Sequence, residues 1–240
     1  MSLFWWLATR VDHEEWLDQG LGSLEGVARS LGDLNRINRW LGGIRSLASH
    51  LSPRLRRWRT APIWLLDLGA GGCATPMAMV RWARAEGIPL RVIALDIQAR
   101  HLCWAREWTQ EWPEISLVQG DARHPPFREG HIDVVISSLF LHHLPEAELA
   151  TLLPSWLGIA RRSIVMSDLV RHPIPYYFIK VASPLFARSR LTRHDAAVSI
   201  RRAYTPQELQ AIVLAAGLPE AQIVTHFPYR MTLVIDKAEA

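Results

Sequence analysis

The chain has 240 residues, of which 49% are hydrophobic and 21% charged, enough to bury one core but short for two ordinary domains. Two cysteines are too few for a disulfide framework, which favours a cytoplasmic protein. The apolar stretches are far shorter than the roughly 20 residues of a membrane-spanning helix, and no signal segment is evident, so we expect no transmembrane segment. The net charge of +4 comes mainly from scattered arginines, so it does not by itself indicate a nucleic-acid partner.

The first sixty residues are predicted to form a helical cap. Between Leu24 and Leu41, apolar residues recur every three or four positions, which is the pattern of an amphipathic helix, and Gly42 and Gly43 close it. We therefore divide the chain into a cap over residues 1–60 and a core over residues 61–240.

The core alternates short apolar runs with helical patterns, and each run ends in an acidic or glycine-rich turn. Helical patterns occur, for example, over Pro76–Glu86 and Ala99–Gln110. The predicted strands are Ile63–Leu68, Leu90–Leu95, Ile115–Val118, Ile132–Ser137 and Ser163–Ser167. This alternation predicts an α/β fold, a doubly wound and mostly parallel sheet with helices on both faces.

The end of the chain predicts one more helix and two strands. Thr205, Pro206 and Glu208 form the pattern of a capping box with proline at the first helical position, and Gly217 ends that helix. Ile223–Phe227 and Arg230–Ile235 follow, joined by a very short turn, so they must be antiparallel neighbours. The sheet then has seven strands, with an antiparallel strand at the C-terminal end.

Residues 171–203 lie between the fifth strand and the last helix and are rich in proline, aromatic residues and arginine. This composition predicts a lid-like insertion over a pocket, and a packed pair of helices is the alternative. An apolar lid suits an aromatic or alkyl-bearing ligand, and its arginines can meet a carboxylate or phenolate.

The segment from Leu65 to Ala74 has the form of a buried strand, a glycine turn and the start of a helix. It also matches the dinucleotide fingerprint, so a nicotinamide enzyme is an alternative. Asp67 before the first glycine is suited to a ligand's ammonium group or a water, and a pyrophosphate would gain nothing from it. Asp96 ends the next strand, where it can accept ribose hydroxyls in either interpretation. Asp121 follows the third strand, where it can accept the amine of an adenine.

At these positions, and at Ile132–Ser137 followed by His142-His143-Leu144, the chain resembles the class I S-adenosylmethionine-dependent methyltransferases over about residues 63–236. Within them it looks most like the ubiquinone/menaquinone-type small-molecule enzymes. The resemblance implies S-adenosylmethionine as cofactor and S-adenosylhomocysteine as product. The cofactor-binding residues that it implies are Asp67, Gly69, Ala70, Gly71, Asp96, Ile97, Asp121, Ala122, Ser137 and Ser138.

A narrower resemblance, to bacterial methyltransferases encoded beside type III polyketide synthases, is carried by residues 35–43, 191–195 and 199–205. It implies a small aromatic acceptor from a polyketide pathway and favours methylation of a phenolic or quinol-type oxygen over carbon. The sequence departs from the family at Cys73, which replaces the third glycine of the turn. A side chain there can weaken cofactor binding, but a small residue is often tolerated at this place, so we retain the predicted site.

Methyl transfer from a sulfonium is an in-line displacement, so a dedicated base is optional. If the acceptor is a hydroxyl, a histidine can take its proton. His142 and His143 follow the fourth strand, where ligands bind in open parallel sheets, and His194 is adjacent to Asp195. We interpret these three histidines as catalytic candidates; holding a loop by hydrogen bonds is the alternative for each. No metal is predicted.

Two other functions compete with small-molecule methylation. The high pI and the sequence His124-Pro125-Pro126-Phe127 suggest a nucleic-acid methyltransferase, but this segment precedes the fourth strand and lacks the leading polar residue. We therefore predict no nucleic-acid partner. A catalytically weak partner subunit of a biosynthetic assembly is the non-enzyme alternative; Cys73 supports it, and the three aspartates count against it.

Overall fold

A seven-stranded sheet forms the centre of the computed structural model, which describes residues 9–59, 61–218 and 220–237. The strand order is β3-β2-β1-β4-β5-β7-β6. The strands are β1 (Ile63–Leu68), β2 (Leu90–Asp96), β3 (Ile115–Gln119), β4 (Ile132–Ser138), β5 (Ala160–Leu169), β6 (Gln222–His226) and β7 (Arg230–Asp236). Strands β1 to β5 run parallel, whereas β7 is antiparallel to both β5 and β6. This is the Rossmann-like, mostly parallel sheet that the sequence predicts.

Helices cover both faces of this sheet because each carries an apolar stripe. On one face, α2 (Gly43–Arg57) and α3 (Ala74–Glu86) bury leucine, methionine and valine side chains against β1, β2 and β4. On the other face, α5 (Glu146–Ile159) and α8 (Pro206–Ala215) pack against β4, β5 and β7, with Trp156 fully buried. Helix α4 (Ala99–Trp108) lies beside β2 and β3. No helix of the described ranges has the length and apolar character that spanning a membrane requires.

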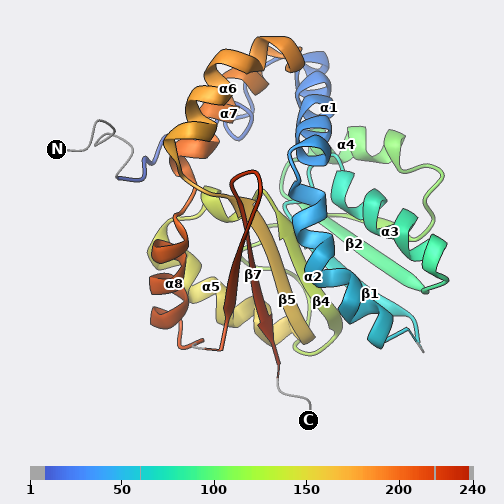
Figure 1. Cartoon of the computed structure of the whole chain (residues 1–240). Helices are drawn as coiled ribbons and strands as arrows, with labels where there is room; N and C mark the ends of the chain where they lie inside the picture. Colours follow the sequence, from blue (N-terminus) through green and yellow to red (C-terminus); the bar gives the residue numbers. More distant parts are fainter. Residues whose placement is uncertain (1–8, 60, 219, 238–240) are drawn as a thin grey trace.

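Three further helices gather beyond the carboxyl ends of the parallel strands. They are α1 (Leu24–Trp40), α6 (Pro173–Phe186) and α7 (Arg190–Arg202), and Figure 1 shows them together at the top of the molecule, above the sheet. Helices α6 and α7 pack together through Tyr176, Ile179 and Ile200, while α1 packs against α7 and α4. The insertion predicted between the fifth strand and the last helix thus consists of two helices that pack against each other.

The N-terminal segment expected to be a cap contains two helices with different surroundings. Gly42 adopts φ 78°, a left-handed conformation, so the chain turns between α1 and α2 without a loop. Leu47, Leu51 and Leu55 of α2 are buried against one face of the sheet, whereas α1 lies beyond the carboxyl ends of the strands. Residues 1–8 of the predicted cap lie outside the described residues.

The predicted elements after residue 60 occur close to their expected positions. The first strand has the expected bounds, and the antiparallel pair at the C-terminus is present. The capping box is complete: Thr205 Oγ1 accepts the Glu208 N–H, and the Glu208 carboxylate accepts the Thr205 N–H. The fifth strand is longer than predicted and starts at Ala160, because Arg161 and Arg162 extend it while pairing with Asp133.

Candidate cofactor and acceptor site

A pocket of about 860 Å³ opens at the carboxyl ends of β1 to β4. This volume is near the upper end for small-molecule sites, which run from about 300 to 1,000 Å³. The glycine turn after β1 and the ends of β2 and β3 line one part of it, and α1, α6, α7 and the segment before α1 line the other. The pocket therefore joins the predicted cofactor residues to the predicted lid.

The glycine turn after β1 is held tightly against β2. The backbone N–H groups of Gly69 and Ala70 both donate to the carbonyl of Leu95, at 2.9 and 3.0 Å. Gly69 has φ 70°, and a Cβ added there would lie 2.6 Å from Cδ2 of Phe140. Only glycine satisfies both the left-handed backbone and this close approach, so the turn leaves open backbone facing the pocket.

Asp96 at the end of β2 organises the next part of the pocket. Its carboxylate accepts the N–H of Gly71 at 2.7 Å and the N–H of Gln98 at 2.8 Å. These bonds fix the carboxylate between the glycine turn and the start of α4. Asp121 after β3 is more exposed, and its Oδ1 accepts the N–H of Arg123 at 2.9 Å.

Asp67 is the most deeply buried of the described acids that line the pocket, with only 2% of its surface exposed. Its Oδ1 accepts no hydrogen bond from any described residue. Burial, together with the nearby charge of Asp96, raises the pKa of Asp67 well above its ordinary value. A cationic ligand group that binds the free oxygen of Asp67 would offset the cost of burying a carboxylate with an unpaired oxygen. The donor set therefore fits a ligand that carries an ammonium group, ribose hydroxyls and an amine-bearing base.

Nine of the ten cofactor residues implied by the resemblance lie in the pocket wall, and Ser137 does not. Ser137 is fully buried within the sheet, beside Leu68 of β1 and Met166 of β5. Because side chains alternate along a strand, Ser138 points the other way, lines the pocket and accepts a hydrogen bond from Asn38 Nδ2 at 3.1 Å.

Cys73 lies behind the turn rather than in the pocket wall. It has φ 59° and packs with Ala94 and Ala105, and burial raises the pKa of its thiol. The neighbouring residues Gly72 and Ala74 face the pocket instead. Its side chain therefore leaves the cofactor surface clear, which removes the main support for a partner subunit with an impaired site.

We expect Cys73→Gly to change the affinity for S-adenosylmethionine less than about threefold. Glycine relieves a left-handed backbone but loses the buried thiol contacts, so the effects on stability oppose each other. Isothermal titration calorimetry checks the affinity, and thermal unfolding confirms that the fold persists. A gain of tenfold or more would show that Cys73 does obstruct the cofactor.

His142 is enclosed by two carboxylates. Its Nδ1 lies 2.7 Å from Asp168 Oδ1, its backbone N–H donates to Asp168 Oδ2 at 2.9 Å, and its Nε2 lies 3.3 Å from Glu15 Oε1. Burial alone would lower the pKa of His142, but Asp168 and Glu15 outweigh burial and raise it to about 9. In this arrangement both ring nitrogens of His142 are protonated at neutral pH, so the imidazole is not suited to take a proton from an acceptor.

His143 and His194 have different surroundings. His143 lines the pocket with 21% of its side chain exposed, and Asp18 Oδ2 lies 2.7 Å from its Nδ1. His194 lies outside the pocket wall: its ring stacks on Trp16 at 3.7 Å, and its Nδ1 lies 2.9 Å from Asp195. The structure thus brings His142 and His143 to the pocket and keeps His194 away from it.

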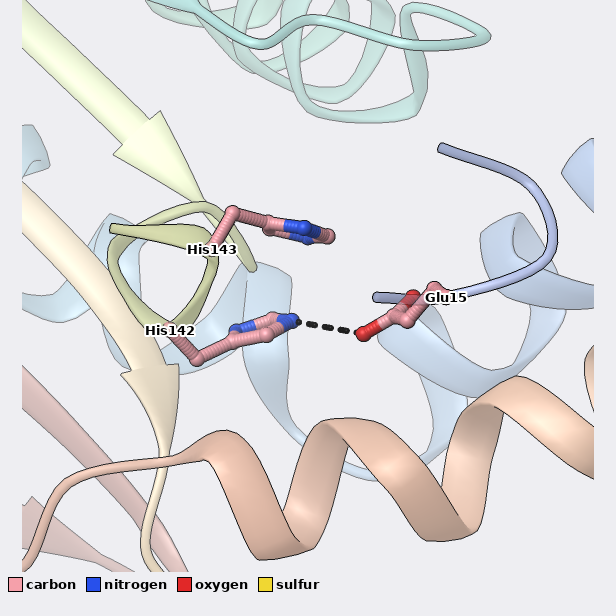
Figure 2. A group of neighbouring side chains, drawn as sticks. All are labelled: Glu15, His142 and His143. Carbon is pink, nitrogen blue, oxygen red and sulfur yellow. Dashed lines mark ion pairs between the residues drawn. The ribbon is translucent and has the colours of Figure 1, made fainter. Parts of the chain in front are cut away.

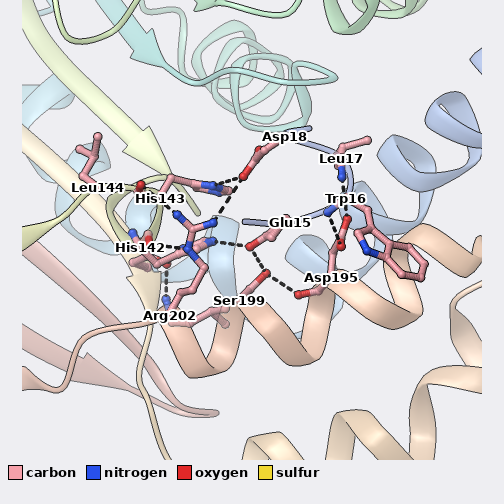
Figure 3. Close-up of polar contacts among 12 residues, drawn as sticks. Glu15, Trp16, Leu17, Asp18, His142, His143, Leu144, Asp195, Ser199 and Arg202 are labelled. Atoms are coloured by element: carbon pink, nitrogen blue, oxygen red, sulfur yellow. Dashed lines mark hydrogen bonds and ion pairs between the residues drawn. The ribbon is translucent and has the colours of Figure 1, made fainter. Parts of the chain in front are cut away.

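The segment before α1 supplies polar groups that the sequence did not indicate (Figure 3). Glu15 lies beside His142 and accepts a hydrogen bond from Ser199 Oγ of α7 at 2.6 Å. Asp195 accepts the backbone N–H groups of Trp16 at 2.9 Å and Leu17 at 3.1 Å. Arg202 donates to the carbonyls of His142 and His143. These contacts join residues up to 184 positions apart, and no local pattern reports them.

Comparison with known proteins agrees with this arrangement. Residues 66–158 match the family model described as a methyltransferase domain. A malonyl-[acyl-carrier protein] O-methyltransferase of Xylella fastidiosa is 36% identical over 86 residues, which are 35% of this chain and 28% of that protein. The matched segment therefore spans less than a third of this relative's length.

Solved structures match over most of the chain. Human N-acetylserotonin methyltransferase superposes with a TM-score of 0.65 at 14% identity, over 95% of this chain and 63% of that one. The plantazolicin methyltransferase, solved with S-adenosylhomocysteine, gives 0.61 at 14% identity over 90% and 98%. The superpositions and the sheet order show that the chain has the Rossmann-like fold of methyltransferases, and the match to a methyltransferase domain covers the segment that carries Asp67, Asp96 and Asp121.

Proposed function

We propose that this chain transfers the methyl group of S-adenosylmethionine to a hydroxyl of a small aromatic acceptor. The observation that carries the proposal is the continuity of one pocket from the carboxylates at the strand ends to the apolar side chains of α1 and α6. Leu34, Ile37, Phe178 and Ile179 line the second part, which suits an aromatic ring. The names of the similar proteins support a small-molecule acceptor, and one of them is an O-methyltransferase.

In this proposal, the three aspartates divide the cofactor between them. Asp67 accepts the ammonium group, Asp96 the ribose hydroxyls, and Asp121 the amine of the adenine. The bound cofactor supplies an electrophilic methyl group. The chain then has to hold the acceptor oxygen in line behind that group and exclude water, which α6 and α7 do as a lid.

Among the three histidines proposed from the sequence, His143 is best placed to contact the acceptor. It faces the pocket, and Asp18 fixes its ring. His142 positions the loop after β4 through Asp168. We do not assign His194 a part in the reaction, because it lies outside the pocket wall.

Calorimetric titration with S-adenosylmethionine and S-adenosylhomocysteine tests the cofactor. We expect micromolar binding of both, because the carboxylates are already held in place. Radiolabelled methyl transfer to a panel of phenols, with matching aromatic amines and ring-carbon nucleophiles, then tests the acceptor atom. A folded protein that binds neither compound contradicts the proposal, and labelling of carbon alone contradicts the preference for oxygen.

A further inference from the structure

Glu15, His142 and His143 converge at the acceptor side of the pocket (Figure 2). Each offers one ligand atom, and these atoms all lie within 4.8 Å of one another. They come from the segment before α1 and from the turn η2 (Leu141–His143) after β4. We propose that these three residues bind a divalent transition-metal ion such as zinc, iron or manganese.

The outer hydrogen bonds of the histidines favour this assignment. Each Nδ1 lies 2.7 Å from a carboxylate oxygen, of Asp168 for His142 and of Asp18 for His143. Metal-binding histidines usually donate one ring N–H to such a carboxylate, which fixes the ring and leaves the other nitrogen for the metal. Both Nε2 atoms are therefore the ones left for an ion.

The separation of the ligand atoms suits one shared ion. His142 Nε2 and Glu15 Oε1 are 3.3 Å apart. Two ligands about 2.1 Å from a tetrahedral zinc ion lie about 3.4 Å apart. An ion bound by both atoms replaces the contact that Figure 2 shows as an ion pair, and the ligand atom of His143 lies within 4.8 Å of the other two.

The charge around the cluster also favours a cation. Glu15, Asp18 and Asp168 are carboxylates in contact with the two imidazoles. The two guanidinium groups nearby, of Arg10 and Arg202, donate to backbone carbonyls of the same turn, and Arg202 also lies 3.7 Å from Asp18. A bound ion takes the place of the second ring proton of His142, and with both imidazoles then neutral, three negative and two positive charges give the ligand cluster a net negative charge that the ion balances.

Three protein ligands, two histidines and one carboxylate, leave a position open for a substrate, as in catalytic zinc sites and non-haem iron sites. All three residues line the pocket, so this position faces the acceptor space. An ion there would coordinate an acceptor oxygen and acidify its hydroxyl, making a separate base unnecessary. That use rests on the proposed function, whereas binding of the ion does not.

The test is titration of the chelator-treated full chain with Co²⁺ and Zn²⁺ in the absence of S-adenosylmethionine. We expect one Co²⁺ per chain, with visible d–d absorption bands, and competition by Zn²⁺. His50 and His226 form another histidine pair, with Nε2 atoms 3.2 Å apart. The titration is therefore done in a His226→Ala background, which removes this second place for an ion.

In that background, His143→Ala and Glu15→Gln are each expected to weaken Co²⁺ binding at least tenfold. Glu15→Gln preserves an oxygen for Ser199, and His143 is partly exposed, so thermal unfolding should show both variants folded. The matched control is His194→Ala, which alters another histidine paired with a carboxylate and should leave the affinity unchanged.

Absence of Co²⁺ binding in the His226→Ala chain, or binding that persists there in both ligand variants, would overturn the proposal. The Co²⁺ titration needs neither cofactor nor acceptor, so it tests metal binding even if the chain transfers no methyl group. Binding of Co²⁺ without any methyl transfer would in turn contradict the proposed function alone.

Discussion

Asp96→Ala is expected to weaken the binding of S-adenosylmethionine about 30- to 150-fold. In the proposed complex, two ribose hydroxyls donate to this carboxylate, and hydrogen bonds to a charged acceptor are together worth about 2–3 kcal/mol here. The variant also releases the N–H of Gly71, which Asp96 now holds at 2.7 Å, so the glycine turn loses support. Calorimetric titration measures the affinity directly.

Asp133→Ala is the matched control for that measurement. Asp133 is also buried, at the start of β4, where it accepts the N–H of Trp64 at 2.9 Å and pairs with two arginines. It lies outside the pocket wall, so the variant should lose stability without losing affinity. Unchanged affinity in Asp96→Ala would reject the assignment of the ribose to Asp96.

Asp67→Asn is expected to act in opposite directions on stability and on cofactor binding. The pKa of Asp67 is raised because the group is buried and close to Asp96. A raised pKa in the folded state means that its contribution to stability is present while the carboxyl is protonated and is lost as pH rises through that pKa. The asparagine variant avoids this loss, so at neutral pH its free energy of unfolding should exceed that of the unmodified chain by about 1 kcal/mol.

Urea unfolding without ligand, at several pH values, measures this difference. It should shrink as pH falls and be smallest below about pH 3, where the carboxyl is protonated in both the folded and unfolded states. Cofactor affinity should instead fall about tenfold or more, because the ammonium group loses its charged partner. Lower stability of the variant at neutral pH would contradict the cost assigned to burying the Asp67 carboxylate. Unchanged cofactor affinity would contradict the binding of the ammonium group by Asp67.

The sheet could be predicted from the sequence because each strand is a short apolar run with a clear end. The same pattern located the acids: Asp67, Asp96 and Asp121 are conspicuous because each follows or ends a run of apolar residues. It was harder to predict which of two neighbouring side chains faces the pocket, because Ser137 and Ser138 are the same residue type at adjacent positions. Only the register with β1 and β5 shows that Ser138 faces the pocket.

The acceptor side of the pocket could be predicted only in part. The histidines after β4 were found because they occupy a fixed place in an open parallel sheet. Glu15 was not found, because Glu14 beside it is equally acidic and the choice between them depends on Ser199 and His142, far along the chain. The insertion was predicted by its composition, but its two helices and their packing on α1 depend on tertiary contacts.

Hydrogen bonds between α7 and the segment before α1 tie the position of α7 to the position of Glu15. Asp195 holds the backbone at Trp16 and Leu17, and Ser199, one turn further along α7, holds Glu15. A displacement of α7 from the sheet either breaks these bonds or draws Glu15 away from His142. Any ligand whose entry required α7 to move would therefore also break these bonds or separate Glu15 from His142.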